Sequence, residues 1–93
     1  MLIYDLQNRQ VLANTDTGEG CTPQMANLEK QLKDIMNHYH DGFYNGSEIH
    51  TYVGNVLKKT GLELVGVQTD DPSWDVFMAF NKARVRVAIK IPK

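Results

Sequence analysis

The sequence predicts a small α+β fold in which two helices pack on one face of an antiparallel sheet, in the order β-β-α-α-β-β-β. Apolar residues recur every three or four positions in the middle of the chain and every second position on both sides of it. Capping residues and glycines bound the two middle segments, and short connections between the last three segments favour an antiparallel meander. The 93 residues amount to a single domain, residues 1–93.

The first two strands are predicted from alternation at the start of the chain. Residues from Leu2 to Leu6 alternate with a period of two, which is typical of a strand. A polar interruption then precedes Val11–Ala13, which we expect to return as the second arm of a hairpin. Residues 14–20 carry two glycines among polar side chains and are predicted to form a loop. The alternation does not decide whether this hairpin extends the sheet or forms a separate arm.

The first predicted helix begins after Thr22 and ends near Gly42. Thr22 is a suitable N-cap, and Pro23 suits the first helical position, where a backbone N–H would have no partner. Glu29 and Lys33 form a favourable i,i+4 pair, and Gly42 suits a left-handed cap at the C-terminal end. The apolar stripe of this helix comprises Met25, Leu28, Leu32, Ile35, Met36 and Tyr39.

The second predicted helix begins after Ser47 and ends near Gly61. Ser47 is the expected N-cap, and Glu48 places a negative charge at the positive end of the helix dipole. Lys58 and Lys59 place positive charge at the opposite end, just before Gly61. The apolar stripe comprises Ile49, Tyr52, Val53, Val56 and Leu57.

Three strands are predicted after the second helix, where the period changes from about 3.6 to two. They are Leu62–Gln68, Trp74–Phe80 and a last strand that begins at Arg84, and a turn at Thr69–Ser73 separates the first two. The middle strand carries Val76, Met78 and Phe80 on one face and Asp75, Phe77 and Ala79 on the other. In the last strand, Val85, Val87, Ile89 and Ile91 are expected to point inward, and Arg84, Arg86, Ala88 and Lys90 outward.

The composition narrows the class of protein and its compartment. Ten basic and eleven acidic residues give a net charge of -1, so the chain lacks the strong positive field of a typical nucleic-acid binder. The single cysteine, Cys21, cannot form an internal disulfide, and the chain does not open with a secretory signal pattern. We therefore expect a cytoplasmic protein. No stretch approaches the roughly 18 apolar residues of a membrane span, so no membrane partner is predicted.

A polar and aromatic segment between His38 and His50 is the most enzyme-like feature of the sequence. It holds all three histidines of the chain, and imidazole and carboxylate groups suit zinc. His40, Glu48 and His50 are therefore candidate metal ligands, and the segment is a candidate small-molecule site. The alternative, which we favour, is a solvated corner between two helices, because the histidine spacing does not place the ligands on one helix face.

No catalytic set is evident elsewhere in the chain. Cys21 lies beside the start of a predicted helix, where a thiolate would be stabilised, but the sequence places no base near it. A glycine-rich phosphate loop is also missing. We therefore predict a protein without catalytic residues and without a cofactor.

The leading functional hypothesis is an interaction module that binds a protein partner or a second copy of itself. Aromatic residues outside the helix stripes are expected at its surface, namely Phe43, Tyr44, Trp74 and Phe77. The alternative is that these four complete the core under the loops.

A basic strand face supports a different hypothesis, nucleic-acid binding. Its residues are Arg84, Arg86 and Lys90. If the neighbouring strand turns Phe77 toward this face, a base could stack on the ring between the cations. The alternative is a solvated sheet face whose charges prevent aggregation.

Overall fold

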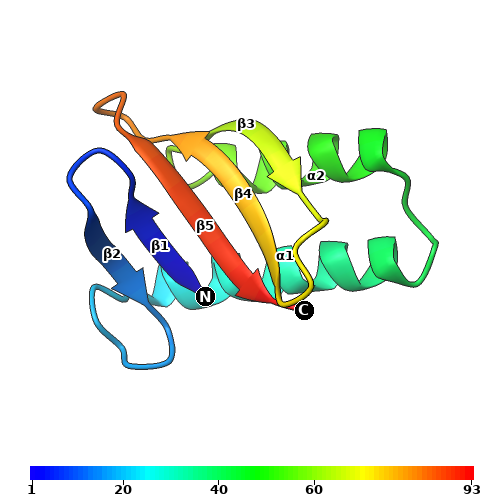
Figure 1. Cartoon of the computed structure of the whole chain (residues 1–93), viewed down its shortest axis with the longest axis horizontal. Coiled ribbons are helices and arrows are strands. Elements are labelled where there is room, and N and C mark those ends of the chain that lie inside the picture. Colours follow the sequence, from blue (N-terminus) through cyan, green and yellow to red (C-terminus); the bar gives the residue numbers. More distant parts are fainter.

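The computed structural model describes all 93 residues and confirms the predicted fold class, with two helices and a five-stranded antiparallel sheet (Figure 1). The elements in chain order are β1 (Leu2–Asp5), β2 (Gln10–Asn14), α1 (Pro23–His40), α2 (Gly46–Lys58), β3 (Glu63–Gln68), β4 (Trp74–Phe80) and β5 (Arg86–Pro92). The strands lie side by side in the order β2-β1-β5-β4-β3, so the last three form the predicted meander.

The N-terminal hairpin extends the sheet. β1 pairs with β5, so that Ile3 lies opposite Ile89 and Asp5 lies opposite Val87. β5 is therefore the central strand, with β1 on one side and β4 on the other. The alternation of β1 could not reveal this pairing, because a strand pattern defines two faces but does not name the neighbouring strand.

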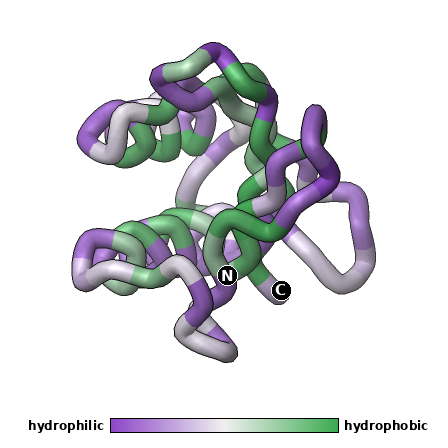
Figure 2. Tube along the Cα trace, turned by 90° about the vertical axis from the view of Figure 1, so that its left-hand side faces the viewer, coloured by the Kyte–Doolittle hydropathy of each residue, from purple (hydrophilic) through white to green (hydrophobic).

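Both helices cover the same face of the sheet. Figure 1 shows them behind the strands, and the edge-on view of Figure 2 shows them on one side of the strands only. Neither helix has the length and apolar character needed to cross a lipid bilayer. The core between the layers consists of Met1, Ile3, Ala13, Leu28, Leu32, Ile35, Met36, Ile49, Val53, Leu57, Phe77, Ala79, Val87, Ile89 and Ile91.

α1 begins and ends where the sequence predicts. Thr22 has an extended backbone, its hydroxyl accepts a hydrogen bond from the first turn, and Pro23 is the first helical residue. Gly42 has a φ of 86°, a left-handed conformation that glycine adopts without a Cβ clash. The N–H of Phe43 donates to the carbonyl oxygen of His38 at 2.8 Å and completes a Schellman turn. This turn sets the direction in which the chain leaves the helix.

α2 begins at a different cap from the predicted one. The prediction of Ser47 is wrong, because the N-cap is Asn45 and Ser47 lies inside the helix. Asn45 Oδ1 accepts the N–H of Glu48 at 2.8 Å, while Glu48 Oε1 accepts the N–H of Asn45 at 3.0 Å. This reciprocal pair satisfies two N–H groups that the helix itself leaves free. The predicted end is confirmed, since the chain turns out of α2 at Gly61.

Asp5 closes the turn between β1 and β2. Its Oδ1 accepts the N–H groups of Gln7 and Asn8, each at 2.9 Å, and its Oδ2 accepts the side-chain amide of Asn8 at 2.8 Å. The hydrogen bond from the backbone of Asn8 is the main reason that the pKa of the Asp5 carboxyl lies below 3.8. Leu6 is therefore the first residue of the turn and not, as predicted, the last residue of the strand.

The last strand begins at Arg86, and its predicted start at Arg84 is wrong. Asn81 Oδ1 accepts the N–H groups of Ala83 at 2.9 Å and Val85 at 3.0 Å, and this holds the segment in a turn. Arg84 has a φ of 62°, a left-handed conformation that interrupts the strand. Arg84 and Val85 therefore do not continue the two faces of β5.

We predict that Gly20→Ala lowers the free energy of unfolding by more than Gly18→Ala. Both glycines have a positive φ, 66° and 79°, so both substitutions carry the cost of a left-handed backbone, about 1–2 kcal/mol. The methyl group added at position 20 overlaps the carbonyl oxygen of Leu12, whereas at position 18 it meets nothing within 4 Å. Urea denaturation measures both losses, and equal losses would contradict the close approach of the loop to β2.

Candidate functional site

The face of the sheet that the helices leave open is the candidate functional site. Side chains of a strand alternate between its two faces. On β5, residues buried in the core therefore alternate with Arg86, Ala88 and Lys90, which lie on the open face. The helix-facing residues of β5 are Val87, Ile89 and Ile91. The predicted division of the last strand into two faces is thus confirmed from Arg86 onward.

One row of residues crosses all five strands of the open face. The pairing register places Val11, Tyr4, Ala88, Met78 and Gly66 in a line from β2 to β3. Val11 is 40% exposed, and Tyr4 and Met78 are half-buried. Ala88 is buried although no helix covers it, because its neighbours in the row carry larger side chains. We call these five residues the apolar row.

Further apolar side chains flank the apolar row. They are Leu2 and Val76, which pair on either side of Lys90; Phe80, which pairs with Arg86; and Trp74, which lies opposite Pro92. Val76 is buried, and the other three apolar side chains are half-buried. The open face therefore presents three aromatic rings, those of Tyr4, Trp74 and Phe80, among aliphatic side chains.

A bulge in β3 adds an exposed aliphatic residue to one edge of the open face. The register between β3 and β4 shifts between Leu64 and Gly66, which leaves Val65 unpaired and 56% exposed. A shallow hollow of about 330 Å³ lies beside it. The hollow is lined by Val65, Met78, Ala79, Phe80 and Arg86. Its wall is therefore apolar, with one cation at the rim.

Two cations of the open face have no anionic partner. Arg84 does have one, because its Nη1 lies 2.9 Å from Glu63 Oε2, and its guanidinium also lies 5.0 Å from the centre of the Phe80 ring. Neither Arg86 nor Lys90 takes part in any ion pair of the structure. Both project from the central strand, so the middle of the face carries two uncompensated positive charges.

Phe77 does not belong to the open face, and its prediction as a surface residue is wrong. It is 0% exposed, pairs with Ile89 and forms part of the core under the helices. The register between β4 and β5 instead turns Phe80 toward the cations. Alternation could not choose between these two aromatics, because both faces of β4 are apolar.

Phe43 and Tyr44 lie in the connection between the two helices and not on the sheet. Phe43 is 73% exposed, and its ring meets the edge of His38 at 6.2 Å. His38 stacks on Tyr44 at 5.1 Å, and Tyr44 meets Tyr52 at 4.9 Å. The negative charge of Glu48, together with burial, raises the pKa of Tyr52 above 10.0. This ring stack is a second location, so the predicted partner-binding residues do not form one surface.

The three candidate metal ligands do not converge, and the hypothesis that they form a metal site is wrong. Glu48 is held in the capping pair with Asn45. His50 borders a groove between α2 and β3, and His40 reaches across to Asp75. No group of three or more metal-ligating side chains occurs in the structure. The separation arises because Glu48 and His50 belong to α2, whereas His40 ends α1.

A histidine–carboxylate pair joins the end of α1 to the start of β4. His40 Nε2 lies 2.8 Å from Asp75 Oδ2, and Asp75 is only 1% exposed. Asp75 Oδ1 is also buried and has no hydrogen-bond partner. The histidine therefore supplies the only hydrogen bond that compensates this buried carboxylate. The two residues are 35 positions apart, so no local motif predicts their contact.

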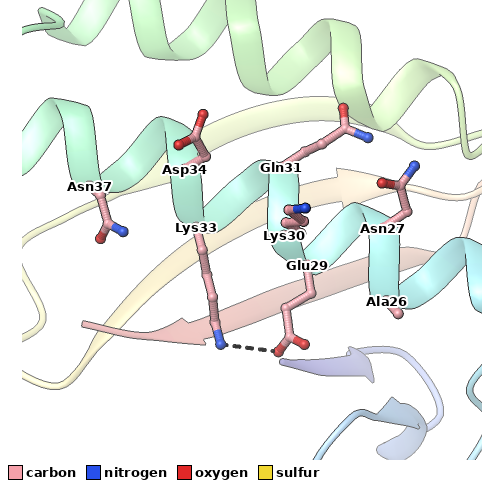
Figure 3. A pocket seen from close by; sticks show the side chains of 8 residues that line it. All are labelled: Ala26, Asn27, Glu29, Lys30, Gln31, Lys33, Asp34 and Asn37. Atoms are coloured by element: carbon pink, nitrogen blue, oxygen red, sulfur yellow. Dashed lines mark ion pairs between the residues drawn. The ribbon is translucent and has the colours of Figure 1, made fainter.

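A polar groove runs along α1 (Figure 3). It measures about 760 Å³ and is lined by eight residues, only one of them hydrophobic. All eight belong to α1, and one helix cannot enclose a ligand. The lining residues are Ala26, Asn27, Glu29, Lys30, Gln31, Lys33, Asp34 and Asn37. We regard this groove as the solvated side of the helix.

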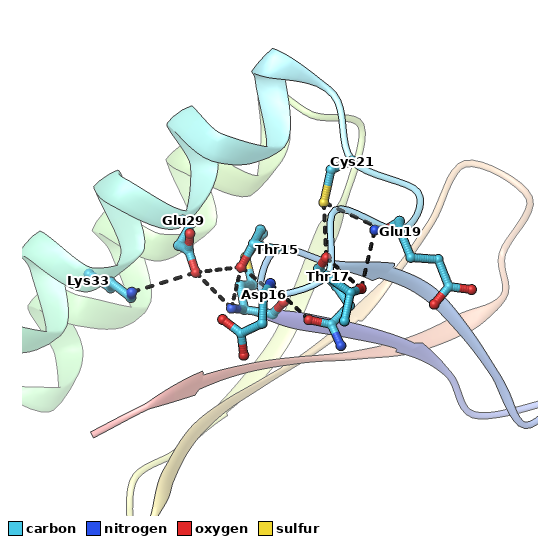
Figure 4. Close-up of polar contacts among 9 residues, drawn as sticks. Thr15, Asp16, Thr17, Glu19, Cys21, Glu29 and Lys33 are labelled. Carbon is cyan, nitrogen blue, oxygen red and sulfur yellow. Dashed lines mark hydrogen bonds and ion pairs between the residues drawn. The ribbon is translucent and has the colours of Figure 1, made fainter.

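Glu29 on α1 forms an ion pair and hydrogen bonds with residues beside the start of β1 (Figure 4). Its Oε2 lies 2.7 Å from the α-ammonium of Met1, 2.8 Å from Thr15 Oγ1 and 3.6 Å from Lys33 Nζ. The predicted pair of Glu29 and Lys33 is thus confirmed. Burial opposes ionisation of Glu29, but the hydrogen bonds from Met1 and Thr15 and the two positive charges outweigh it. The pKa of Glu29 therefore lies below its ordinary value of 4.5.

Cys21 is a free thiol in the loop before α1 (Figure 4). Its Sγ donates to the carbonyl oxygens of Asn14 at 3.3 Å and Glu19 at 3.5 Å. Both partners are backbone groups, so no side-chain base is bonded to the thiol.

Sequence reasoning missed much of the open face. Of the predicted partner-binding residues, Trp74, Arg86 and Lys90 lie on it. Tyr4, Met78 and Val65 also lie on it and were not predicted. One signal was present: β4 carries apolar residues on both of its faces, which is more than a strand with one solvated face requires.

The chain matches no model of a known protein family, no curated protein and no solved structure. Its function is therefore inferred from the geometry and chemistry of its surface.

We predict that His40→Ala lowers the free energy of unfolding by about 1–3 kcal/mol or more, because it leaves the buried Asp75 carboxylate without a partner. The double variant His40→Ala/Asp75→Val should lose less, since the buried charge leaves with its partner. His50→Ala is the control, because the His50 side chain is exposed and takes part in no ion pair of the structure. Urea denaturation of these variants and of Asp75→Val provides the values, and a double variant that loses the sum of the two single losses would contradict the coupling.

We predict that Glu29 stabilises the fold at neutral pH and loses this effect in acid. Its pKa is lower in the folded chain, so its contribution is present above about pH 4.5 and disappears as the pH falls through the lowered value. Glu29→Gln should therefore be less stable than the parent at neutral pH, and the difference should shrink below pH 4.5. Glu19→Gln is the control, because Glu19 is exposed and takes part in no ion pair of the structure. Urea denaturation over a pH series tests this, and a difference independent of pH would contradict it.

Proposed function

We propose that this chain is a non-catalytic interaction module that binds a protein partner on the open face of its sheet. The observation that carries the proposal is the apolar row, which crosses all five strands and is covered by neither helix. Sheets with an apolar face normally bury it against a second layer. An apolar face left uncovered is typical of an interaction site.

The open face has the composition of a protein interface. Its middle is apolar and aromatic, and half-buried rings are already held by their neighbours, so they lose little conformational freedom on binding. Polar residues end the rows on either side of the apolar row, as in the polar rim of an interface. These residues are Asn14 on β2 and Glu63 and Gln68 on β3. A cytoplasmic location remains part of the proposal, on the support of the single free cysteine.

Single-stranded nucleic acid is the second candidate partner. Tyr4 and Phe80 are half-buried rings on the same face as Arg86 and Lys90, and bases stack on such rings between cations. A protein partner is favoured because most of the face is aliphatic. Only two unpaired cations are available for phosphates, and the net charge of the chain is -1.

We predict that a photo-crosslinking amino acid at position 4 captures a protein in the native cell, whereas the same amino acid at position 52 does not. Tyr4 belongs to the apolar row, and Tyr52 is a matched exposed aromatic residue on α2. Met78→Glu should abolish the adduct from position 4, because it places a charge where the partner would exclude water. Gel mobility and mass spectrometry of the adducts provide the measurement.

The controls separate binding from folding. Circular dichroism and urea denaturation must show that the Met78→Glu chain still folds, which is expected because Met78 faces away from the helices. Protein adducts of equal yield from positions 4 and 52 would contradict the proposal. Adducts from position 4 that contain nucleic acid would favour the second candidate.

A further inference from the structure

Building on the docking function proposed above, we infer that the partner is another protein that lays an acidic amphipathic segment along β5. This assigns a chemical class to the occupant of the open face and favours a different protein over a second copy of the chain. Three features of the face support the inference: its charge, the spacing of its cations and the hollow beside one of them.

The charge of the open face selects an anionic partner. Arg86 and Lys90 project from the central strand, which carries no acid, and neither has an ion-pair partner; Glu63 at the β3 edge is already paired with Arg84. An apolar partner surface that covered both cations would leave them desolvated and uncompensated, which is costly. A partner that brings carboxylates to these two positions removes this cost and gains charge-assisted hydrogen bonds.

The same charge disfavours association of two copies through this face. A symmetric dimer has an isologous interface, in which the same patch meets itself. Two stacked faces would bring Arg86 and Lys90 of both copies together on central strands that carry no acid, and each Glu63 is paired with its own Arg84. The face is therefore not complementary to itself, and a different protein is the occupant.

The spacing of the cations sets the spacing of the acids. Arg86 and Lys90 are four residues apart on one strand, which corresponds to about 13 Å. A helix rises about 1.5 Å per residue, so carboxylates at positions i and about i+8 of a helix match this distance. Apolar residues between them would face Ala88 and the adjoining side chains of Tyr4 and Met78.

The hollow beside Arg86 provides a place for an anchor residue. Its volume of about 330 Å³ is bounded by apolar side chains, with the guanidinium of Arg86 at the rim. A partner could place a large apolar side chain in the hollow and an acid next to it. The apolar side chain would contact the wall of the hollow, and the acid would pair with Arg86. Helical segments with large apolar residues between two acidic residues have this chemistry.

Three synthetic helical peptides of one leucine-rich sequence test the inference, with Glu, Gln or Lys at positions i and i+8. Titration of each into the isotopically labelled chain, followed by backbone amide NMR shifts, gives both the location and the Kd. We expect the Glu peptide to bind the open face at least tenfold more tightly than the Lys peptide. The variant Arg86→Glu/Lys90→Glu should reverse this preference. Lys30→Glu/Lys58→Glu, with the same change of charge on the helices, should not.

The other outcomes distinguish this inference from the proposed function. Equal or tighter binding of the Gln or Lys peptide at the open face would overturn the acidic partner and retain the docking function. If none of the peptides shifts the amides of the open face, both the docking function and the inference lose their support. Tighter binding of a thymidine oligonucleotide than of the Glu peptide would overturn the inference in favour of nucleic acid. A dimer in sedimentation equilibrium that Met78→Glu dissociates would overturn it in favour of self-association.

Discussion

The pairing of β5 on both of its edges is the constraint on which the rest of the structure depends. β5 comes last in the chain, yet it lies in the middle of the sheet, between β1 and β4. Its residues Val87, Ile89 and Ile91 are at most 1% exposed and form the centre of the core under the helices. β1 has a place in the sheet only because β5 offers it a free edge. Pairing of the two ends of the chain then brings Met1 within reach of Glu29 on α1.

The open face follows from the same arrangement. Helices of 18 and 13 residues are enough to cover one face of a five-stranded sheet, and the chain has no further element for the other. The strands nevertheless carry apolar residues on that other face, and the central strand adds two cations to it. A surface that combines uncovered apolar area with unpaired charge is suited to association, because a partner can satisfy both at once.

Two polar contacts position α1 on the sheet in addition to the apolar core. Glu29 ties α1 to the start of β1, and His40 ties the end of the same helix to Asp75 on β4. Hydrophobic contacts are not directional and tolerate sliding of one layer over the other. Buried ionic and hydrogen-bonded contacts have a narrow geometry, and breaking one leaves a desolvated group without a partner. These two contacts therefore favour a single placement of α1 on the sheet.

The sequence by itself determined the type and order of all seven elements, the start of α1, the C-terminal ends of both helices and the division of β5 into two faces. These features depend on residues only a few positions apart, such as Thr22 and Pro23 at the start of α1. Local patterns failed where a side chain two residues or more away formed hydrogen bonds with the backbone. The N-cap of α2 is therefore Asn45 and not Ser47, and hydrogen bonds to Asn81 hold Ala83–Val85 in a turn, so that the last strand begins at Arg86. The tertiary structure alone decided the position of the hairpin, the burial of Phe77 and the assembly of Tyr4, Met78 and Arg86 on one face. The hairpin and the open face depend on pairing between β1 and β5, which are distant in the chain, and the burial of Phe77 depends on which face of β4 the helices cover. Alternation with a period of two defines two faces but decides neither the neighbouring strand nor the covered face.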